Sequence, residues 1–193
     1  MSPRFGIVIE QERCLGCDTC TIACQVENSP TTGPWIWVET VGSDGKDKPA
    51  GNYPDLRLDF LPRLCQHCAQ PPCVPACPTR ALWQRQDGLV LLADDKCNGC
   101  QVCLAACPYA ALSYNAKTGF VEKCHLCHHR IDQGRAPFCV VCCEGQAMHF
   151  GDLDDPHSDV SQLIATRGAV TLKPEAGTKP AVYYCPPRPR RPL

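Results

Sequence analysis

The sequence of 193 residues lacks a long hydrophobic run, and this absence excludes a membrane-spanning helix. Such a helix needs about 18 or more consecutive apolar residues, and the apolar stretch at residues 88–93 is far shorter. Neither sign of charge is in excess, because 19 Lys and Arg stand against 20 Asp and Glu. A nucleic-acid-binding domain normally carries a basic excess. We therefore predict no direct membrane span and no nucleic-acid partner.

Signals for targeting and for catalysis are also missing. Residues 1–10 contain neither the apolar segment of a secretory signal nor paired arginines. The chain is therefore expected either in the cytoplasm or exported together with another protein. No nucleophile–base arrangement and no phosphate-binding loop can be recognised. We accordingly expect this chain to be non-catalytic.

Cysteine, in contrast, is abundant. Sixteen of the 18 cysteines fall into four groups of four, which we number in chain order. The groups are Cys14, Cys17, Cys20 and Cys24; Cys65, Cys68, Cys73 and Cys77; Cys97, Cys100, Cys103 and Cys107; and Cys124, Cys127, Cys139 and Cys143. Four cysteines are the ligand set of one [4Fe–4S] cluster. The count therefore predicts four such clusters, with all sixteen thiolates as metal ligands.

The spacing within the groups supports this interpretation. Group three is the C-x2-C-x2-C-x3-C-P run of bacterial ferredoxins, whose thiolates reach different irons of one cluster. Group one keeps the spacing but has Gln25 in place of the proline, group two is wider, and group four has a long loop and Glu144 after its last cysteine. Disulfide frameworks rarely repeat one such phrase, and zinc sites use pairs of C-x2-C rather than triplets.

The fourth cysteine of each group is expected to bind the neighbouring cluster, as in two-cluster ferredoxins. Pro78 and Pro108 follow the last cysteine of groups two and three, whereas groups one and four lack this proline, so we pair two with three and one with four. Pairing one with two and three with four is the alternative. The predicted ligand sets are Cys65, Cys68, Cys73 and Cys107; Cys97, Cys100, Cys103 and Cys77; Cys14, Cys17, Cys20 and Cys143; and Cys124, Cys127, Cys139 and Cys24.

Short strands are predicted ahead of the cysteine loops, at residues 5–9, 56–61 and 89–92, with a hairpin over 112–121 ahead of group four. A helix is predicted from Cys20 to Asn28. This pattern indicates an α+β fold of two interlocked ferredoxin-like lobes. We predict one lobe from residues 1–28 and 115–150 and the other from 56–114. Residues 29–55 form an insertion, and residues 151–193 an extended C-terminal arm.

The remaining residues receive simpler expectations. Trp35 and Trp37 in the insertion either cover the lobe or form a docking loop. Cys142 and Cys185 are expected to be free thiols, although Cys142 could compete with Cys143 as a ligand. The histidines near the loops are expected to be supporting or surface residues, because every cluster already has four cysteines; they are His67, His125, His128 and His129. Charged residues flanking the loops are expected either to offset the charge of the clusters or to be ordinary solvated groups; they are Arg63, Lys96, Lys123 and Arg130.

Four cysteine groups in this order, with the widened second and the long fourth, resemble the iron–sulfur subunits of molybdopterin oxidoreductases of the dimethyl-sulfoxide-reductase type. The segment Cys65 to Thr79, CQHCAQPPCVPACPT, is especially specific. The later segments GDLDDP and LKPEAGTKP are similar to those of polysulfide, thiosulfate and arsenate reductase small subunits. One departure is Glu144 where the family commonly has proline, which leaves the last ligand of group four open.

The resemblance implies a large catalytic partner that holds a bis-pterin molybdenum or tungsten centre, and often a membrane anchor that exchanges electrons with quinol, or a cytochrome. It also implies the one-with-four and two-with-three pairing. Such subunits are peripheral to the cytoplasmic membrane, at the periplasmic face when a partner's twin-arginine signal carries them across, with the cytoplasm as the alternative. The leading hypothesis is therefore an electron-transfer subunit; the rival is a free polyferredoxin that shuttles electrons.

Overall fold

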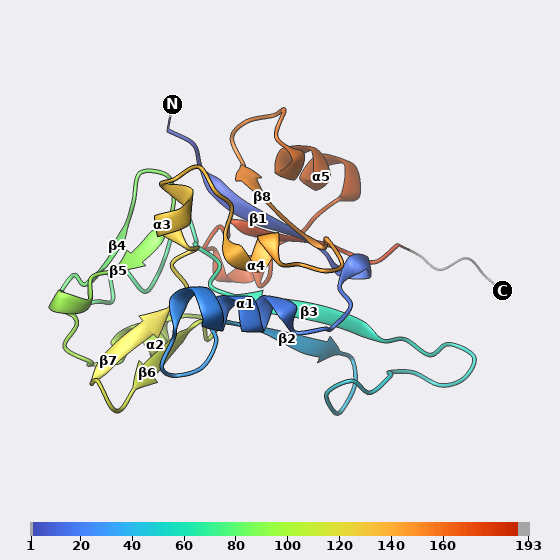
Figure 1. The fold of residues 1–193 in the computed structure, drawn as a ribbon, viewed down its shortest axis with the longest axis horizontal. Helices are drawn as coiled ribbons and strands as arrows, with labels where there is room; N and C mark the ends of the chain where they lie inside the picture. The colour runs from blue at the N-terminus through green and yellow to red at the C-terminus, as the bar shows by residue number, and fades with distance from the viewer. Residues whose placement is uncertain (1, 189–193) are drawn as a thin grey trace.

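The largest sheet joins the two ends of the chain. The computed structural model describes residues 2–188. Strand β1 (Phe5–Glu10) lies between β8 (Met148–Asp152), which is antiparallel to it, and β9 (Val182–Cys185), which is parallel (Figure 1). With both edges paired, β1 is buried along most of its length, which suits its run of β-branched residues.

Three antiparallel hairpins supply the remaining strands. They pair β2 (Ile36–Val41) with β3 (Asp59–Leu64), β4 (Leu82–Gln84) with β5 (Val90–Leu92), and β6 (Leu112–Asn115) with β7 (Phe120–Lys123). The predicted hairpin ahead of group four is confirmed. The β2–β3 hairpin projects to one side, whereas the other two lie together at the opposite end (Figure 1).

The helices are short. The α-helices are α1 (Thr19–Asn28), α2 (Val102–Ala106), α3 (His128–Ile131), α4 (Phe138–Val141) and α5 (Asp159–Arg167). Single turns of 3-10 helix are η1 (Gln11–Arg13), η2 (Asp94–Lys96) and η3 (Pro174–Ala176). The first four α-helices follow or overlap cysteine loops, and α1 confirms the helix predicted there. None of the helices among residues 2–188 is long and apolar enough to cross a membrane.

The apolar interior is divided among small cores that include cysteines. One contains Ile7, Ile9 and Tyr184 together with Cys20, Cys24 and Cys139. Another gathers the inner faces of the β4–β5 and β6–β7 hairpins around Cys73 and Cys103. The mixture of short helices and small, mainly antiparallel sheets agrees with the predicted α+β class.

The C-terminal segment is not the extended arm that the sequence predicted. Helix α5 packs against β8 and β1, with Val160 fully buried, and β9 completes the sheet beside β1. Ser158 caps α5 by accepting a hydrogen bond from the backbone N–H of Ser161, and Gly168 ends it in a left-handed conformation. The prediction failed because strand β9 is short and its partner lies far away in the sequence. Residues 189–193 lie outside the described residues.

The insertion at residues 29–55 is partly regular structure. Its β2 strand pairs with β3, which leads into cysteine group two. Trp35 packs on the core beside His125, with the ring centroids 5.2 Å apart, as expected of a tryptophan that covers the lobe. Trp37 is more peripheral, and its indole N–H points to Glu39.

Tyr184 connects the C-terminal strand to the second cysteine loop and provides a test of this arrangement. Its buried hydroxyl donates to the carbonyl of Pro62 at 3.0 Å and lies 3.4 Å from the amide of Gln66. We expect Tyr184→Phe to lower the free energy of unfolding by about 1–2 kcal/mol, because buried partners lose a hydrogen bond. Tyr183→Phe, on the more exposed side of the same strand, should change it by less than about 0.5 kcal/mol. Equal denaturation midpoints for the two variants in anaerobic solution would contradict the packing of β9 against the second cysteine loop.

Candidate iron–sulfur centres

All four cysteine groups begin with the same backbone turn. The residue just before the second cysteine has a positive φ in every group: 66° at Gly16, 40° at His67, 68° at Gly99 and 56° at Leu126. A left-handed residue at this point curls the chain, so that cysteines three apart lie around a common centre. Glycine suits the turn in groups one and three, whereas His67 and Leu126 adopt it at a steric cost of roughly 1–2 kcal/mol each.

Two of the predicted ligand sets line separate enclosed cavities. Cys65, Cys68, Cys73 and Cys107 line one of them, and Cys24, Cys124, Cys127 and Cys139 line the other. Both have mainly apolar walls. In both, three thiols come from one loop and the fourth comes from a distant loop.

The thiols of the other two sets are also brought together, as their mutual electrostatic influence shows. The pKa of the Cys14 thiol is raised by burial and by the nearby thiols of Cys143 and Cys17. The pKa of Cys20 is raised by burial and by the thiols of Cys14 and Cys143. The same holds in the remaining set, where burial and then Cys77, Cys100 and Cys97 raise the pKa of Cys103. The structure thus gathers the thiols in the same combinations as the predicted sets.

Burial is the main electrostatic feature of these sites. It raises the pKa of Cys73 and of Cys20 to about 12 and that of Cys68 to about 11, and neighbouring thiols add to the effect. Several thiolates crowded into a dry cavity repel one another unless a cation lies among them. Iron supplies that positive charge and prefers thiolate ligands. The donor set, its burial and the enclosed cavities therefore fit iron–sulfur clusters.

Several sulfurs also receive hydrogen bonds from the protein. The backbone N–H of Leu126 points to Cys124 Sγ at 3.4 Å, and that of Ala147 points to Cys143 Sγ at 3.3 Å. The side-chain amide of Asn28 lies 3.7 Å from Cys24 Sγ and 3.6 Å from Cys127 Sγ. Such donors stabilise thiolates and raise the reduction potential of a bound cluster. Sequence analysis missed Asn28, since nothing in its position signals contact with a loop about 100 residues away.

Group four ends in a turn of the same type as the turns that end groups two and three. Three residues after the last cysteine, the chain is left-handed at Arg80, Ala110 and Gln146, with φ of 55°, 52° and 48°. In each turn the backbone N–H of this residue donates to the carbonyl of the last cysteine, at 3.2, 3.3 and 2.9 Å respectively. For Gln146 the acceptor is Cys143. Cys143, not Cys142, therefore stands at the position that Cys77 and Cys107 hold in their turns, although Glu144 replaces the proline.

Lys123 is the most unusual charged residue near the sites. Its side chain is 3 % exposed, and its ammonium donates to the carbonyl oxygens of Val90 and Cys124. It lines the cavity of Cys65 and Cys107. Burial raises the pKa of the neighbouring Cys124 thiol, and the positive charge of Lys123 opposes this increase. Of the other flanking charges, only Lys96 is exposed. Arg130 and Arg63 are partly buried and form ion pairs, Arg130 with Glu27 at 3.2 Å and Arg63 with Glu39 at 3.7 Å.

His67, Cys185 and Cys142 lie outside the predicted ligand sets. His67 is buried, and its Nδ1 accepts a hydrogen bond from the N–H of Val90 at 3.1 Å. Burial holds its pKa well below the usual value, so the ring is neutral. Cys185 is fully buried in β9 beside Val8 and Val160, as a structural thiol. Cys142 is half-buried.

The shared turn after the last cysteine can be tested with proline. We expect Glu144→Pro to be tolerated and to raise the free energy of unfolding by about 0.4–1 kcal/mol, because proline stands at the same position in groups two and three and restricts the unfolded chain. Gln146→Pro is the control: its φ of 48° is closed to proline, so this variant should be strongly destabilised. Anaerobic chemical denaturation measures both. A marked loss of stability in Glu144→Pro would show that the turns differ.

Comparison with known proteins agrees with this geometry. Residues 56–153 match the family model described as a 4Fe-4S dicluster domain. The chain is 40% identical to a tetrathionate reductase subunit of Salmonella typhimurium over 183 residues, covering 94% of this chain and 72% of that protein. It is 36% identical to the arsenate respiratory reductase iron-sulfur subunit of a Shewanella species, covering 94% and 95% of the two chains, and 38% identical to a sulfite dehydrogenase subunit of Allochromatium vinosum, covering 97% and 85%.

These matches extend over almost the whole chain rather than over one ferredoxin motif, which favours a dedicated subunit over a free shuttle. The resemblance seen in the cysteine spacing is therefore confirmed. The chain belongs to the family of iron–sulfur electron-transfer subunits of molybdopterin oxidoreductases.

Proposed function

We propose that the chain carries four [4Fe–4S] clusters and relays electrons between a bis-pterin molybdenum or tungsten subunit and a quinone-side membrane or cytochrome partner. The proposed ligands are the four sets predicted from the sequence, with Cys143 as the last ligand of group four. Each bound cluster would accept and release one electron. The observation that carries the proposal is that sixteen thiols, distant in sequence, gather in four combinations, each with three thiols from one loop and one from another.

The same contacts support two interlocked lobes. Groups one and four share the core around β1 and the packing of α1 on α4, and groups two and three share the core of the two short hairpins. The proposed boundary between the lobes shifts from residue 114 to the end of β7. Both strands of the β6–β7 hairpin contribute to the second core, through Leu112 and Val121.

Contacts between sites suggest a linear order. Cys73 and Cys103 share one core. This supports neighbouring positions for the site with three ligands from group two and the site with three ligands from group three. The thiol of Cys65 raises the pKa of Cys124, and that of Cys20 raises the pKa of Cys139, after burial in both cases. The proposed row therefore runs from group three through groups two and four to group one.

The two ends of this row reach the surface. Cys100 and Cys17, from the terminal sites, are the exposed cysteines among the described residues. Leu15, two residues before Cys17, is 63% exposed, and α4, which packs on α1, exposes Val141 at 57%. An electron can enter and leave where a terminal site meets a partner, and apolar surface of this kind fits a stable interface. The inner thiols are better shielded from water.

The relatives supply the context for the partners. They are named as subunits of tetrathionate and arsenate reductases and of a sulfite dehydrogenase, so their assemblies include both reductive and oxidative enzymes. We propose a corresponding large catalytic subunit for this chain, in an assembly peripheral to the cytoplasmic membrane. The periplasmic face, reached by co-export, is the proposed location.

Purification of the tagged chain from its native host under anaerobic conditions tests this assignment. The expected result is a stable large subunit at equal stoichiometry, with molybdenum or tungsten in the complex and about sixteen irons on the small chain. A chain that purifies alone with its clusters intact would favour the shuttle instead. Iron far below that count, with zinc in its place, would contradict the relay altogether.

The assignment of Cys143 can be tested with single serine variants. We expect Cys143→Ser to lose up to about four irons, the content of one cluster, and to change the low-temperature EPR spectrum of the reduced protein. Cys142→Ser should keep the wild-type iron content and spectrum. Cys185→Ser serves as a second control outside the cysteine groups. Iron loss in Cys142→Ser alone would reassign the ligand.

Lys123 is proposed to set the potential of the adjoining inner sites. A buried positive charge favours the added electron, and removing it in Lys123→Met should lower the reduction potential by on the order of 1 kcal/mol, or roughly 40 mV for one electron. Lys123→Arg should preserve most of the potential. Lys96→Met removes an exposed charge beside group three, where solvent screening should leave the potential nearly unchanged. EPR-monitored redox titration measures all three, and equal shifts in Lys123→Met and Lys96→Met would refute the role.

A further inference from the structure

Three histidines gather beside group four, outside the four sets of thiols. They are His125, His128 and His129, and each offers a ring nitrogen within 4.8 Å of those of the other two. Their spacing produces the cluster: His125 lies in the C-x2-C turn, and the other two form the first turn of α3, which starts directly after Cys127. Ring centroids lie 4.7 Å apart for His125 and His128 and 5.6 Å apart for His125 and His129.

Two of these rings contain buried nitrogens that lack a partner. Among the described residues, Nδ1 of His125 and Nδ1 of His128 are shielded from solvent and make no hydrogen bond. A buried polar atom left unpaired loses its hydration without compensation, so natural proteins rarely retain one without a purpose. A metal ion bound by the imidazoles would satisfy such nitrogens.

The third ring is already held as metal-binding histidines usually are. Glu27 Oε1 lies 2.7 Å from Nε2 of His129, and the same carboxylate is fixed by Arg130 at 3.2 Å. A carboxylate on one ring nitrogen orients the imidazole and increases the basicity of the other nitrogen, which is the usual support for a histidine ligand. In His129 this arrangement leaves Nδ1 available.

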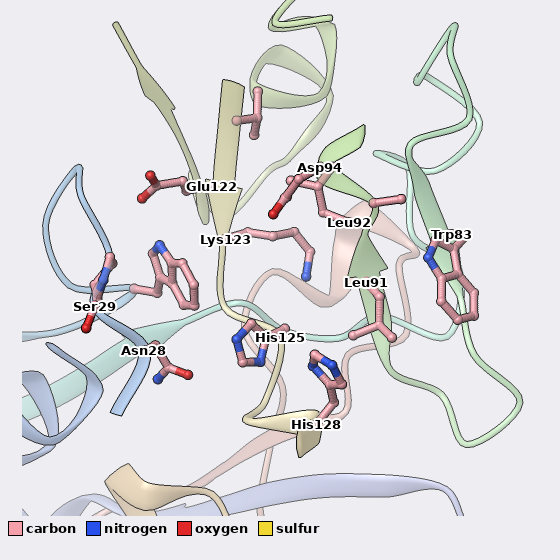
Figure 2. Close-up of a pocket in the computed structure, with 14 residues that line it drawn as sticks. Asn28, Ser29, Trp83, Leu91, Leu92, Asp94, Glu122, Lys123, His125 and His128 are labelled. Carbon is pink, nitrogen blue, oxygen red and sulfur yellow. The ribbon is translucent and has the colours of Figure 1, made fainter. Parts of the chain in front are cut away.

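The cluster opens onto a surface pocket. Figure 2 shows His125 and His128 next to each other at its floor, with the side chain of Lys123 extending toward them and Asp94 and Glu122 on the surrounding strands and turn. The Lys123 ammonium is occupied by two backbone carbonyls, and Asp94 and Glu122 add two carboxylates to the pocket lining.

We propose that His125, His128 and His129 form a site for one divalent metal of the zinc class, beside the pocket that His125 and His128 line. Three imidazoles are suitable ligands for zinc, and tetrahedral Zn–N bonds of about 2.0–2.1 Å need the nitrogens to approach one another by up to about 1.5 Å through side-chain rotation. The site goes beyond the electron relay and uses none of its sixteen thiols. A divalent ion here would place a fixed positive charge next to the loop of Cys124 and Cys127.

Zinc chloride is the probe for this site. The full chain, with its clusters assembled anaerobically, is dialysed against zinc and analysed for zinc, for iron and by zinc K-edge absorption. The expected result is about one zinc per chain with nitrogen neighbours at about 2.0 Å. His128→Gln should lose this zinc, and Glu27→Gln, which keeps all three rings, should bind it about tenfold more weakly. His149→Gln is the matched control, since His149 also faces a carboxylate, Glu10 at 3.1 Å, but stands outside the cluster.

Sulfur neighbours at about 2.3 Å would place the zinc in the cysteine sites and overturn the proposal, as would equal zinc binding by the wild type and His128→Gln. The iron count reports the relay separately. Low iron together with nitrogen-bound zinc would support this site while contradicting four clusters, and full iron without nitrogen-bound zinc would do the opposite.

Discussion

The attraction between buried thiolates and iron is the interaction on which this structure depends. Neutral thiols could fill these cores as small apolar groups, but thiolates crowded into them would repel one another. The cores of the protein include these same cysteines, so we expect folding and cofactor binding to be coupled. This explains how a chain with 19 prolines, 14 glycines and strands of three to six residues can hold a defined shape.

The cysteine spacing predicted the local structure of the sites well, because each loop is a short-range feature. Glycine before the second cysteine in groups one and three indicates the left-handed turn, and the same turn recurs at His67 and Leu126 without a glycine to reveal it. The proline after the last cysteine of groups two and three was used to pair the groups, and its absence in group four left Cys142 and Cys143 as alternatives. The turn after the last cysteine, with the hydrogen bond from the Gln146 N–H to the Cys143 carbonyl, is a feature that the sequence did not predict.

Features that depend on distant residues could not be predicted in this way. Strand β9 is four residues long and pairs with β1, so the sequence alone suggested an extended arm. The contact of Asn28 with Cys127 joins residues 99 apart in the chain. Lys123 and the histidines near group four were recognised as neighbours of a loop, but their burial and mutual contacts come from packing among elements that are separate in the sequence.

The position of β1 has a consequence for the order in which the protein is made. Its two neighbours in the sheet, β8 and β9, are the last strands of the chain, and Cys14 meets Cys143 only after that distant loop has been synthesised. The N-terminal third of the polypeptide therefore leaves the ribosome with thiols that have no complete site. With the proposed ligand sets, metal loading at that end would await synthesis of the loop that carries Cys143.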